Sequence, residues 1–196
     1  MQYIKGLDAF DGRNHTAVTL GKFDGLHRGH QKLLNRIIKY AQKEECDSVV
    51  CAFDMDRDCL MTNEERRAFL EDKVDYLIEI PFTREMMEME AEKFIDEILH
   101  KKLHASYIVV GTDFNFGHEK RGNHQMLEKY AAKYGYTVDV VEKAYYKDRE
   151  ISSTYIREEL KKGNMEKIAD LLGSPFFTAG VIEHGRGMGH RDFFPT

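Results

Sequence analysis

The sequence has few cysteines, no excess of positive charge and no long apolar run, and each of these absences excludes a class of protein. No stretch reaches the roughly 18 to 20 consecutive apolar residues that a membrane-spanning helix needs, and residues 1–8 lack the apolar core of a signal peptide. We therefore expect a cytoplasmic protein with no membrane partner. The three cysteines, Cys46, Cys51 and Cys59, form no CxxC pair, so we expect reduced thiols and neither disulfides nor a zinc site.

The charge balance also limits the range of partners. Apolar residues make up 42% and charged residues 32% of the 196 residues, and the formal net charge is -5. This composition is typical of a soluble globular protein. Because a surface that binds nucleic acid usually carries clustered excess Lys and Arg, we expect no nucleic acid partner. A phosphate-bearing ligand would have to bind at a local site.

Short β-branched apolar runs alternate with segments whose apolar residues recur at helical spacing. Strands are predicted over residues 17–20, 48–53, 76–80, 107–110 and 137–141. Helices are predicted after His30, around residues 94–99 and 126–130, and over 154–161 and 165–172. This alternation predicts an α/β fold, a Rossmann-like parallel sheet with helices on both faces. Ligands of such sheets bind beyond the carboxyl ends of the strands.

The composition changes near Ser174, where Gly, Ser and Pro follow one another. We place a domain boundary there and predict one domain over residues 1–174. Residues 176–182 are predicted to form a strand, followed by a segment rich in glycine. Residues 175–196 are therefore assigned to a second, incomplete unit.

The segment from Gly21 to His30, GKFDGLHRGH, lies between the first predicted strand and the following helix. Gly21 and Gly25 permit tight turns with positive φ, and the unpaired amides at the helix start favour an anion in the same loop. His27 and His30 are three residues apart, so both imidazoles can reach one phosphate chain. Such donors would stabilise departing pyrophosphate in displacement at the α-phosphorus of a nucleoside triphosphate. The alternative is that one histidine caps the helix and the other is solvated.

Two further segments are less specific. In the run SSTYIR, Ser152 to Arg157, hydroxyls and a guanidinium meet at a predicted helix start, so Arg157 could clamp phosphates. Alternatively, the hydroxyls only cap the helix and Arg157 forms an ordinary ion pair with nearby glutamates. The loop over residues 111–122 directly follows a predicted strand, which is the position of a ligand site. Its Phe114 and Phe116 could equally plug the core beneath a surface loop.

Together these three segments resemble the FAD synthetase module of the bacterial bifunctional riboflavin kinase/FMN adenylyltransferases, over roughly residues 15–196. The HxGH pattern of residues 27–30 resembles the nucleotidyltransferase superfamily in general. The pattern DFxFG at 113–117, followed by SSTxIR at 152–157, is narrower and resembles only the members of that superfamily that act on flavins. The resemblance implies a transferase that joins ATP and FMN. The FMN phosphate would attack the ATP α-phosphorus in line, giving FAD and pyrophosphate with Mg²⁺.

The resemblance also implies roles for individual residues. Catalysis would depend on His27, His30 and Arg157. ATP would be bound by Gly21, Phe23, Asp24, Gly25, His27, His30, Ser152, Ser153, Thr154 and Arg157. The cleft for the nucleotide and flavin would be lined by Asp113, Phe114, Phe116, Gly117 and Arg121. No metal site within the protein is expected, because Mg²⁺ would be held mainly by the phosphates of ATP.

The chain differs from the family at residues 53–58, FDMDRD, where the family carries a proline- and histidine-containing stretch. The tail from Gly180 resembles the opening strand and phosphate loop of the riboflavin kinase barrel. The rest of that barrel is not in this sequence, so phosphorylation of riboflavin is expected only of a longer form. Two other functions stay open: a nucleotidyltransferase with another acceptor, such as nicotinamide mononucleotide, or a flavin or nucleotide sensor without turnover. The sequence does not indicate the oligomeric state.

Overall fold

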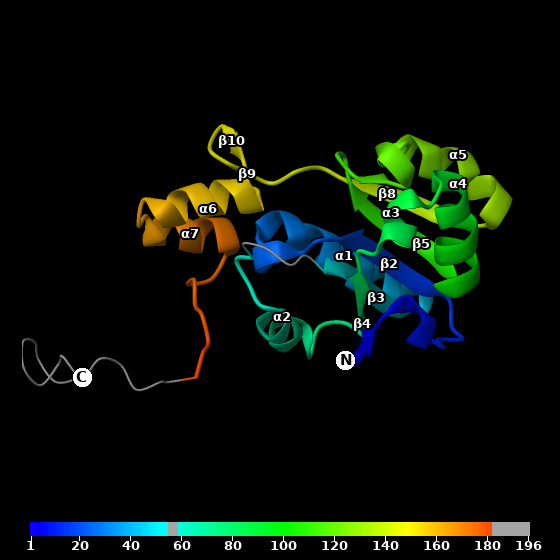
Figure 1. Ribbon diagram of the computed structural model, residues 1–196, viewed down its shortest axis with the longest axis horizontal. Coiled ribbons are helices and arrows are strands. Elements are labelled where there is room, and N and C mark those ends of the chain that lie inside the picture. Colours follow the sequence, from blue (N-terminus) through cyan, green and yellow to red (C-terminus); the bar gives the residue numbers. More distant parts are fainter. Residues whose placement is uncertain (55–58, 182–196) are drawn as a thin grey trace, which may run out of the picture.

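The computed structural model describes residues 1–54 and 59–181. Its centre is a sheet of six parallel strands in the order β1-β4-β3-β2-β5-β8 (Figure 1). These strands are β1 (Gln2–Lys5), β2 (Thr16–Gly21), β3 (Asp47–Asp54), β4 (Tyr76–Pro81), β5 (Ala105–Gly111) and β8 (Thr137–Val141). The predicted parallel α/β sheet is confirmed, with one strand more than the sequence indicated.

The additional strand, β1, lies at the edge of the sheet and pairs with β4, with Tyr3 opposite Leu77. Of its four residues only Ile4 is buried. A strand this short, with one buried side chain, carries too little alternation to be recognised from sequence. Its conformation therefore depends on the hydrogen bonds that β4 offers.

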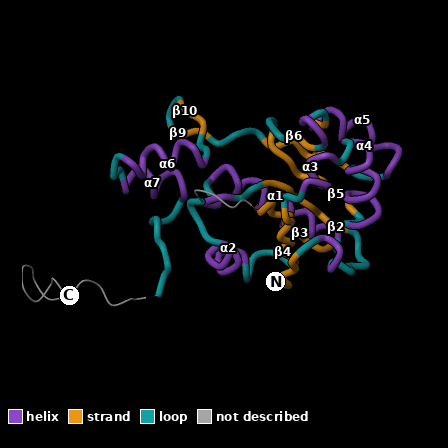
Figure 2. Tube along the Cα trace, in the orientation of Figure 1, coloured by secondary structure: helices purple, strands orange, loops and turns teal. Residues whose placement is uncertain are grey.

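Helices cover both faces of the sheet (Figures 1 and 2). Helices α1 and α2 pack on one face, and the π-helical segment η3 and helix α5 pack on the other. The helices of these layers are α1 (Arg28–Glu44), α2 (Asn63–Leu70), α3 (Arg84–Glu88), α4 (Ala91–Lys93), η3 (Phe94–Lys102) and α5 (His124–Tyr134). On β2, Ala17 belongs to one core and Val18 to the other, because successive side chains of a strand point to opposite faces.

The strand order reverses at β2. From β2 the chain moves outward to β3 and β4 on one side, and then crosses to β5 and β8 on the other. The loops that leave the carboxyl ends of β2 and β5 therefore diverge between two neighbouring strands. In open parallel sheets this is the point at which a crevice for ligands forms.

The last two helices, α6 (Ser153–Lys161) and α7 (Met165–Leu172), form a separate layer beside the sheet (Figure 1). They bury an apolar cluster of their own, which includes Ile156 and Ile168. A small hairpin of β9 (Tyr145–Tyr146) and β10 (Arg149–Glu150) leads into them from β8. The layer is anchored to α1 because Nε2 of Gln31 donates to the Leu172 carbonyl at 2.7 Å.

The strand predicted over 176–182 is wrong for residues 176–181, which have no regular secondary structure. A strand needs a hydrogen-bonding partner, and no strand of the described residues pairs with this segment. The Ala179 amide instead donates to Oε1 of Glu65 at 2.7 Å. The rest of the predicted second unit, and residues 55–58 of the stretch that differs from the family, lie outside the described residues. No helix of the described residues is long and apolar enough to cross a membrane.

Candidate active site

The loop between β2 and α1 has an unusual backbone. Phe23, Gly25 and Leu26 have positive φ angles of 48°, 77° and 41°. The predicted positive φ is thus confirmed for Gly25 and wrong for Gly21, which ends β2. A Cβ at Gly21 would lie 3.4 Å from Cε2 of Phe23, which is an ordinary van der Waals contact, so space does not require glycine there either. Positive φ is costly for Phe and Leu, so this loop needs contacts from other elements to hold its shape.

Those contacts are made to the backbone carbonyls of the loop. Three side chains from other parts of the fold donate hydrogen bonds: Arg66 to Lys22 O at 3.3 Å, Ser153 to Asp24 O at 2.9 Å and Gln31 to Leu26 O at 2.8 Å. The donors come from α2, α6 and α1. The conformation of the loop is therefore fixed from three directions.

The side chain of Asp24 is a further anchor. Its Oδ1 accepts a hydrogen bond from the Leu60 amide at 2.7 Å, and its Oδ2 pairs with the guanidinium of Arg157. Arg157 does form an ion pair, but the glutamate partner expected from the sequence is wrong, because within residues 1–54 and 59–181 the guanidinium pairs with Asp24. Ser152 caps α6, since its Oγ accepts from the Tyr155 amide at 3.2 Å. The SSTYIR segment therefore begins α6 and ties it to the loop after β2.

His27 and His30 lie together at the start of α1. Nδ1 of His27 accepts a hydrogen bond from the His30 amide at 3.4 Å, which makes His27 the N-cap of the helix. The two rings stack with centroids 3.7 Å apart and an interplanar angle of 19°. Because Nδ1 is an acceptor, neutral His27 carries its proton on Nε2, which can then act as a donor. The alternative of a capping histidine is thus correct for His27, but its second part is wrong, because His30 is largely buried and not solvated. Nε2 of His27, which does not take part in the cap, can donate to a ligand.

Burial controls the charge of both histidines. It lowers the pKa of His27 to about 4, and a backbone hydrogen bond opposes this shift only in part. The pKa of His30 is also lowered well below its ordinary value, first by burial and then by the neighbouring His27. Both rings are therefore neutral near pH 7. They offer N–H donors to an anion, and a bound polyphosphate would favour their protonation.

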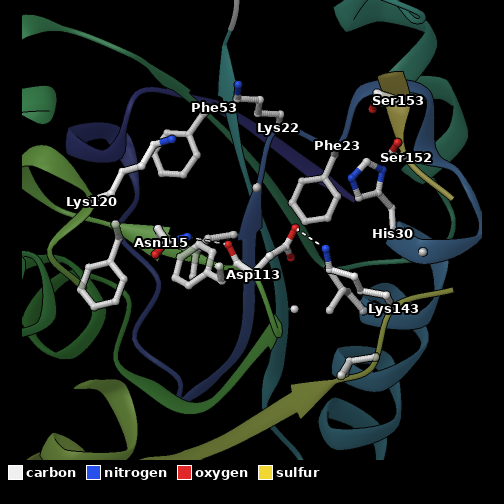
Figure 3. Close-up of a pocket in the computed structure, with 18 of the residues that line it drawn as sticks. Lys22, Phe23, His30, Phe53, Asp113, Asn115, Lys120, Lys143, Ser152 and Ser153 are labelled. Atoms are coloured by element: carbon white, nitrogen blue, oxygen red, sulfur yellow. Dashed lines mark hydrogen bonds and ion pairs between the residues drawn. The ribbon is translucent and has the colours of Figure 1, made fainter. Parts of the chain in front are cut away.

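A cavity of about 700 Å³ opens where the loops after β2 and β5 diverge. Figure 3 shows His30, Ser152 and Ser153 together on one side of it, and Phe53 and Lys120 on the other. Figure 3 also shows the ion pair of Lys143 with Asp113, at 3.1 Å. Lys143 pairs in addition with Glu150 at 2.8 Å. Besides Lys120, the far side carries apolar side chains of the cavity wall: Phe53, Phe82, Met86, Met87, Phe94, Phe114 and Phe116. One cavity thus joins a polar end to an aromatic end.

The FAD synthetase family model matches residues 10–155 of this sequence. The chain belongs to the FAD synthetase family. Bifunctional riboflavin kinase/FMN adenylyltransferases of Buchnera aphidicola (strain Sg) and Haemophilus influenzae are 32% and 33% identical to it over its whole length, which covers 67% and 68% of theirs. The enzyme of that name from Escherichia coli K12 is 31% identical over 91% of this chain and 61% of its own.

A solved structure agrees in fold. The crystal structure of a protein named as a macrolide-efflux protein, from Streptococcus pneumoniae, superposes with a TM-score of 0.83 at 26% identity. The match covers 95% of this chain and 66% of that one. This FAD synthetase chain therefore spans about two thirds of the relatives that it matches.

The fold of this FAD synthetase chain brings most of the predicted site residues to the cavity. Its walls include Gly21, Phe23, His27, His30, Ser152, Ser153, Asp113, Phe114, Phe116 and Gly117. Five others lie outside those walls: Asp24, Gly25, Thr154, Arg157 and Arg121. Asp24 and Arg157 support the loop from behind, whereas Arg121 pairs with Glu119 at 2.6 Å. The contacts of all these residues with ATP and FMN stay predictions.

The sequence allowed two interpretations of Phe114 and Phe116 in the loop after β5, as cavity lining or as core side chains, and each is correct in part. Phe116 is 7% exposed and packs on Phe94 with ring centroids 5.3 Å apart, as a core plug would. Phe114 is partly buried against the same core. Both rings also line the cavity, so its aromatic end is built on the core itself.

Sequence reasoning missed part of the cavity wall. Phe82 and Met87 follow β4, and Lys143 follows β8. These positions share one signal, since each comes shortly after the carboxyl end of a strand. The rule that selected the loop after β5 would have selected them too, had it been applied to every predicted strand.

Proposed function

We propose that this chain transfers AMP from ATP to FMN, giving FAD and pyrophosphate. The observation that carries the proposal is one cavity with two chemically different ends. Neutral histidine donors beside a helix start suit a phosphate chain, and an aromatic wall suits a planar ring. The names of the bifunctional relatives give FMN as the acceptor.

The reaction needs few protein groups. An oxygen of the FMN phosphate would attack the α-phosphorus of ATP, and the bond from that phosphorus to the bridging oxygen would break as pyrophosphate departs. No general base is required, because the FMN phosphate is already ionised at neutral pH. His27 and His30 would donate hydrogen bonds to the oxygens on which charge develops. Their neutral state in the free protein leaves them able to gain charge as the phosphates bind.

We infer that Mg²⁺ arrives with ATP. Among residues 1–54 and 59–181, no group of three or more His, Cys, Asp or Glu side chains could hold a metal ion. The carboxylate of Asp113, which lines the cavity, is already paired with Lys143. The ion would therefore be held by the phosphates, where it neutralises part of their charge.

We infer that the isoalloxazine ring of FMN occupies the aromatic end. Phe82 is 52% exposed and Met87 is 45% exposed, although both are large apolar side chains. Their exposure at a cavity wall is expected where a flat ligand covers them. ATP would take the end that holds the histidines and the hydroxyls of Ser152 and Ser153.

The remaining third of the relatives' length bears on a second activity. We infer that a longer form of this protein adds riboflavin phosphorylation, with a domain boundary near Ser174. We also infer a cytoplasmic location, because both substrates of the proposed reaction, FMN and ATP, are metabolites of the cytoplasm.

The test is direct. The purified chain is incubated with ATP, Mg²⁺ and FMN, and FAD and pyrophosphate are followed by chromatography. Riboflavin and nicotinamide mononucleotide are tested in parallel as acceptors. The proposal is supported if FAD forms when FMN is the acceptor and no product forms with riboflavin or nicotinamide mononucleotide. A product from nicotinamide mononucleotide would assign a different acceptor, and ATP binding with no product would favour a sensor.

A further inference from the structure

A cluster of buried charges lies outside the cavity, between β4 and α2. The side chain of Glu79 is 3% exposed and that of Arg66 is 6% exposed. Oε1 of Glu79 accepts from Arg66 at 3.0 Å. Its Oε2 accepts from the Tyr3 hydroxyl at 2.5 Å and from Arg67 at 3.3 Å. One carboxylate therefore orients two guanidinium groups.

This cluster is costly if stability is its only role. Burial by itself would raise the pKa of Glu79, but hydrogen bonds from Tyr3 and Arg66 outweigh it and hold the pKa below its usual range. The carboxylate is thus charged although its side chain is almost fully shielded from solvent. Removing two charges from water carries a large desolvation cost, and an apolar pair of the same volume often stabilises a fold at least as well. Stability alone is therefore a weak explanation for the cluster.

Arg66 connects the cluster to the candidate active site. Its Nη1 donates to the carbonyl of Lys22 at 3.3 Å, and its Nη2 also donates to Oδ1 of Asn63 at 2.8 Å. Lys22 lies between Gly21 and Phe23, and all three line the cavity. The bond holds the backbone immediately before the left-handed residue Phe23. A planar guanidinium can donate to the Lys22 carbonyl, Asn63 and Glu79 at the same time, and a single ammonium group is less suited to three separate acceptors.

Arg67 provides the internal comparison. It pairs with the same Glu79 carboxylate, and its guanidinium lies 3.4 Å from the centroid of the Tyr3 ring. Among the described residues it makes no hydrogen bond to the loop between β2 and α1. The two arginines therefore share a partner but differ in their contact with the loop.

We propose that Arg66, oriented by Glu79, is a positioning residue for nucleotide binding. By holding the Lys22 carbonyl, it keeps the loop over residues 21–25 in the shape that receives the phosphate chain. This inference rests on the proposed function, because it assigns that loop to ATP. It predicts that the loss of Arg66 impairs ATP binding, and that the loss of Arg67 does not.

The test compares Arg66→Met with the matched control Arg67→Met. Both substitutions remove one guanidinium from Glu79, and only the first removes a bond to the loop. ATP affinity is measured by titration calorimetry with Mg²⁺, and KM for ATP and kcat are measured by FAD formation. We expect Arg66→Met to raise both Kd and KM for ATP at least tenfold, with a smaller change in kcat. Arg67→Met should stay within twofold of the wild type.

Equal effects of the two substitutions on ATP affinity would overturn the proposal, because the cluster would then act only through stability. If Arg66→Met does not fold by circular dichroism, Arg66→Lys replaces it, and an unchanged Kd for ATP in that variant overturns the proposal. A wild-type chain that binds ATP but makes no FAD would reject the proposed function and leave the calorimetric comparison valid. A wild-type chain that binds no ATP would overturn both.

Discussion

The carboxylate of Asp24 pairs with the guanidinium of Arg157, 133 positions later in the sequence. The same carboxylate accepts a hydrogen bond from the Leu60 amide. Three segments that are far apart in the chain are thus joined at one buried side chain. The HxGH loop and the SSTYIR helix therefore form one structural unit, and a change in either is expected to affect the other.

The Asp24–Arg157 pair should be measurable as a coupling. Arg157→Leu is expected to lower the free energy of unfolding by about 1 to 3 kcal/mol, because it leaves a buried carboxylate short of its cation. Asp24→Asn in the same background should cost less than it does alone, with a coupling of about 0.5 kcal/mol or more. Urea denaturation of both single variants and the double variant gives this number. The control is Arg149→Leu, whose ion pair with Glu158 is half exposed and should contribute under about 1 kcal/mol.

Substitutions that remove the imidazole N–H donor of His27 or His30 should reduce kcat for FAD formation more than they reduce the free energy of unfolding. His27→Asn keeps a side-chain oxygen that can cap α1, so we expect a change in the free energy of unfolding of no more than about 1 kcal/mol. Its loss of the imidazole donor should reduce kcat for FAD formation by about 10² to 10³. His30→Gln should behave similarly, whereas the exposed His100→Ala should have no effect. Wild-type kcat in either site variant would refute the assigned roles.

Because the pKa of His27 is lowered in the folded protein, the free energy of unfolding should decrease as the pH falls. The group titrates near 6.5 when unfolded and near 4 when folded, so the unfolded state binds more protons between these values. The stabilisation by neutral His27 is therefore complete above about pH 6.5 and is lost as the pH falls toward 4. It amounts to about 3 kcal/mol at most. Urea denaturation between pH 7 and 4 should show a shallower decline for His27→Asn than for the wild type, and parallel curves would contradict this account.

The aromatic end of the cavity should determine the affinity for FMN. Phe82→Ala removes a half-exposed ring, so stability should change by less than about 0.5 kcal/mol. We expect KM for FMN to rise about tenfold, which corresponds to about 1.4 kcal/mol of lost ring contact. KM for ATP should change less than twofold. Phe177→Ala is the matched control, since Phe177 is 54% exposed and lies away from this cavity, and its KM for FMN should equal that of the wild type.

The conformation of the sequence motifs could be predicted because it depends on interactions between residues close together in the chain. The glycine at position 25, the two histidines and the N-cap of α6 act within one turn of backbone, so their spacing carries their geometry. The same holds for four of the five predicted strands, β2, β3, β4 and β5, whose apolar runs are mostly buried, whereas in β8 only Val141 is buried. The positive φ of Phe23 could not be predicted in this way, because neither its residue type nor its immediate neighbours favour it.

The sequence by itself determined the parallel α/β fold, the position of the phosphate-binding loop and the FAD synthetase resemblance, since each rests on short-range pattern. Only the tertiary structure decided that β1 is a strand, that Arg157 pairs with Asp24, and that Phe82 faces the same cavity as His30. These features depend on contacts between residues far apart in the chain. These contacts form only when the strands have assembled into the sheet. The carboxyl ends of β2 and β5, for example, are neighbours in space and not in sequence.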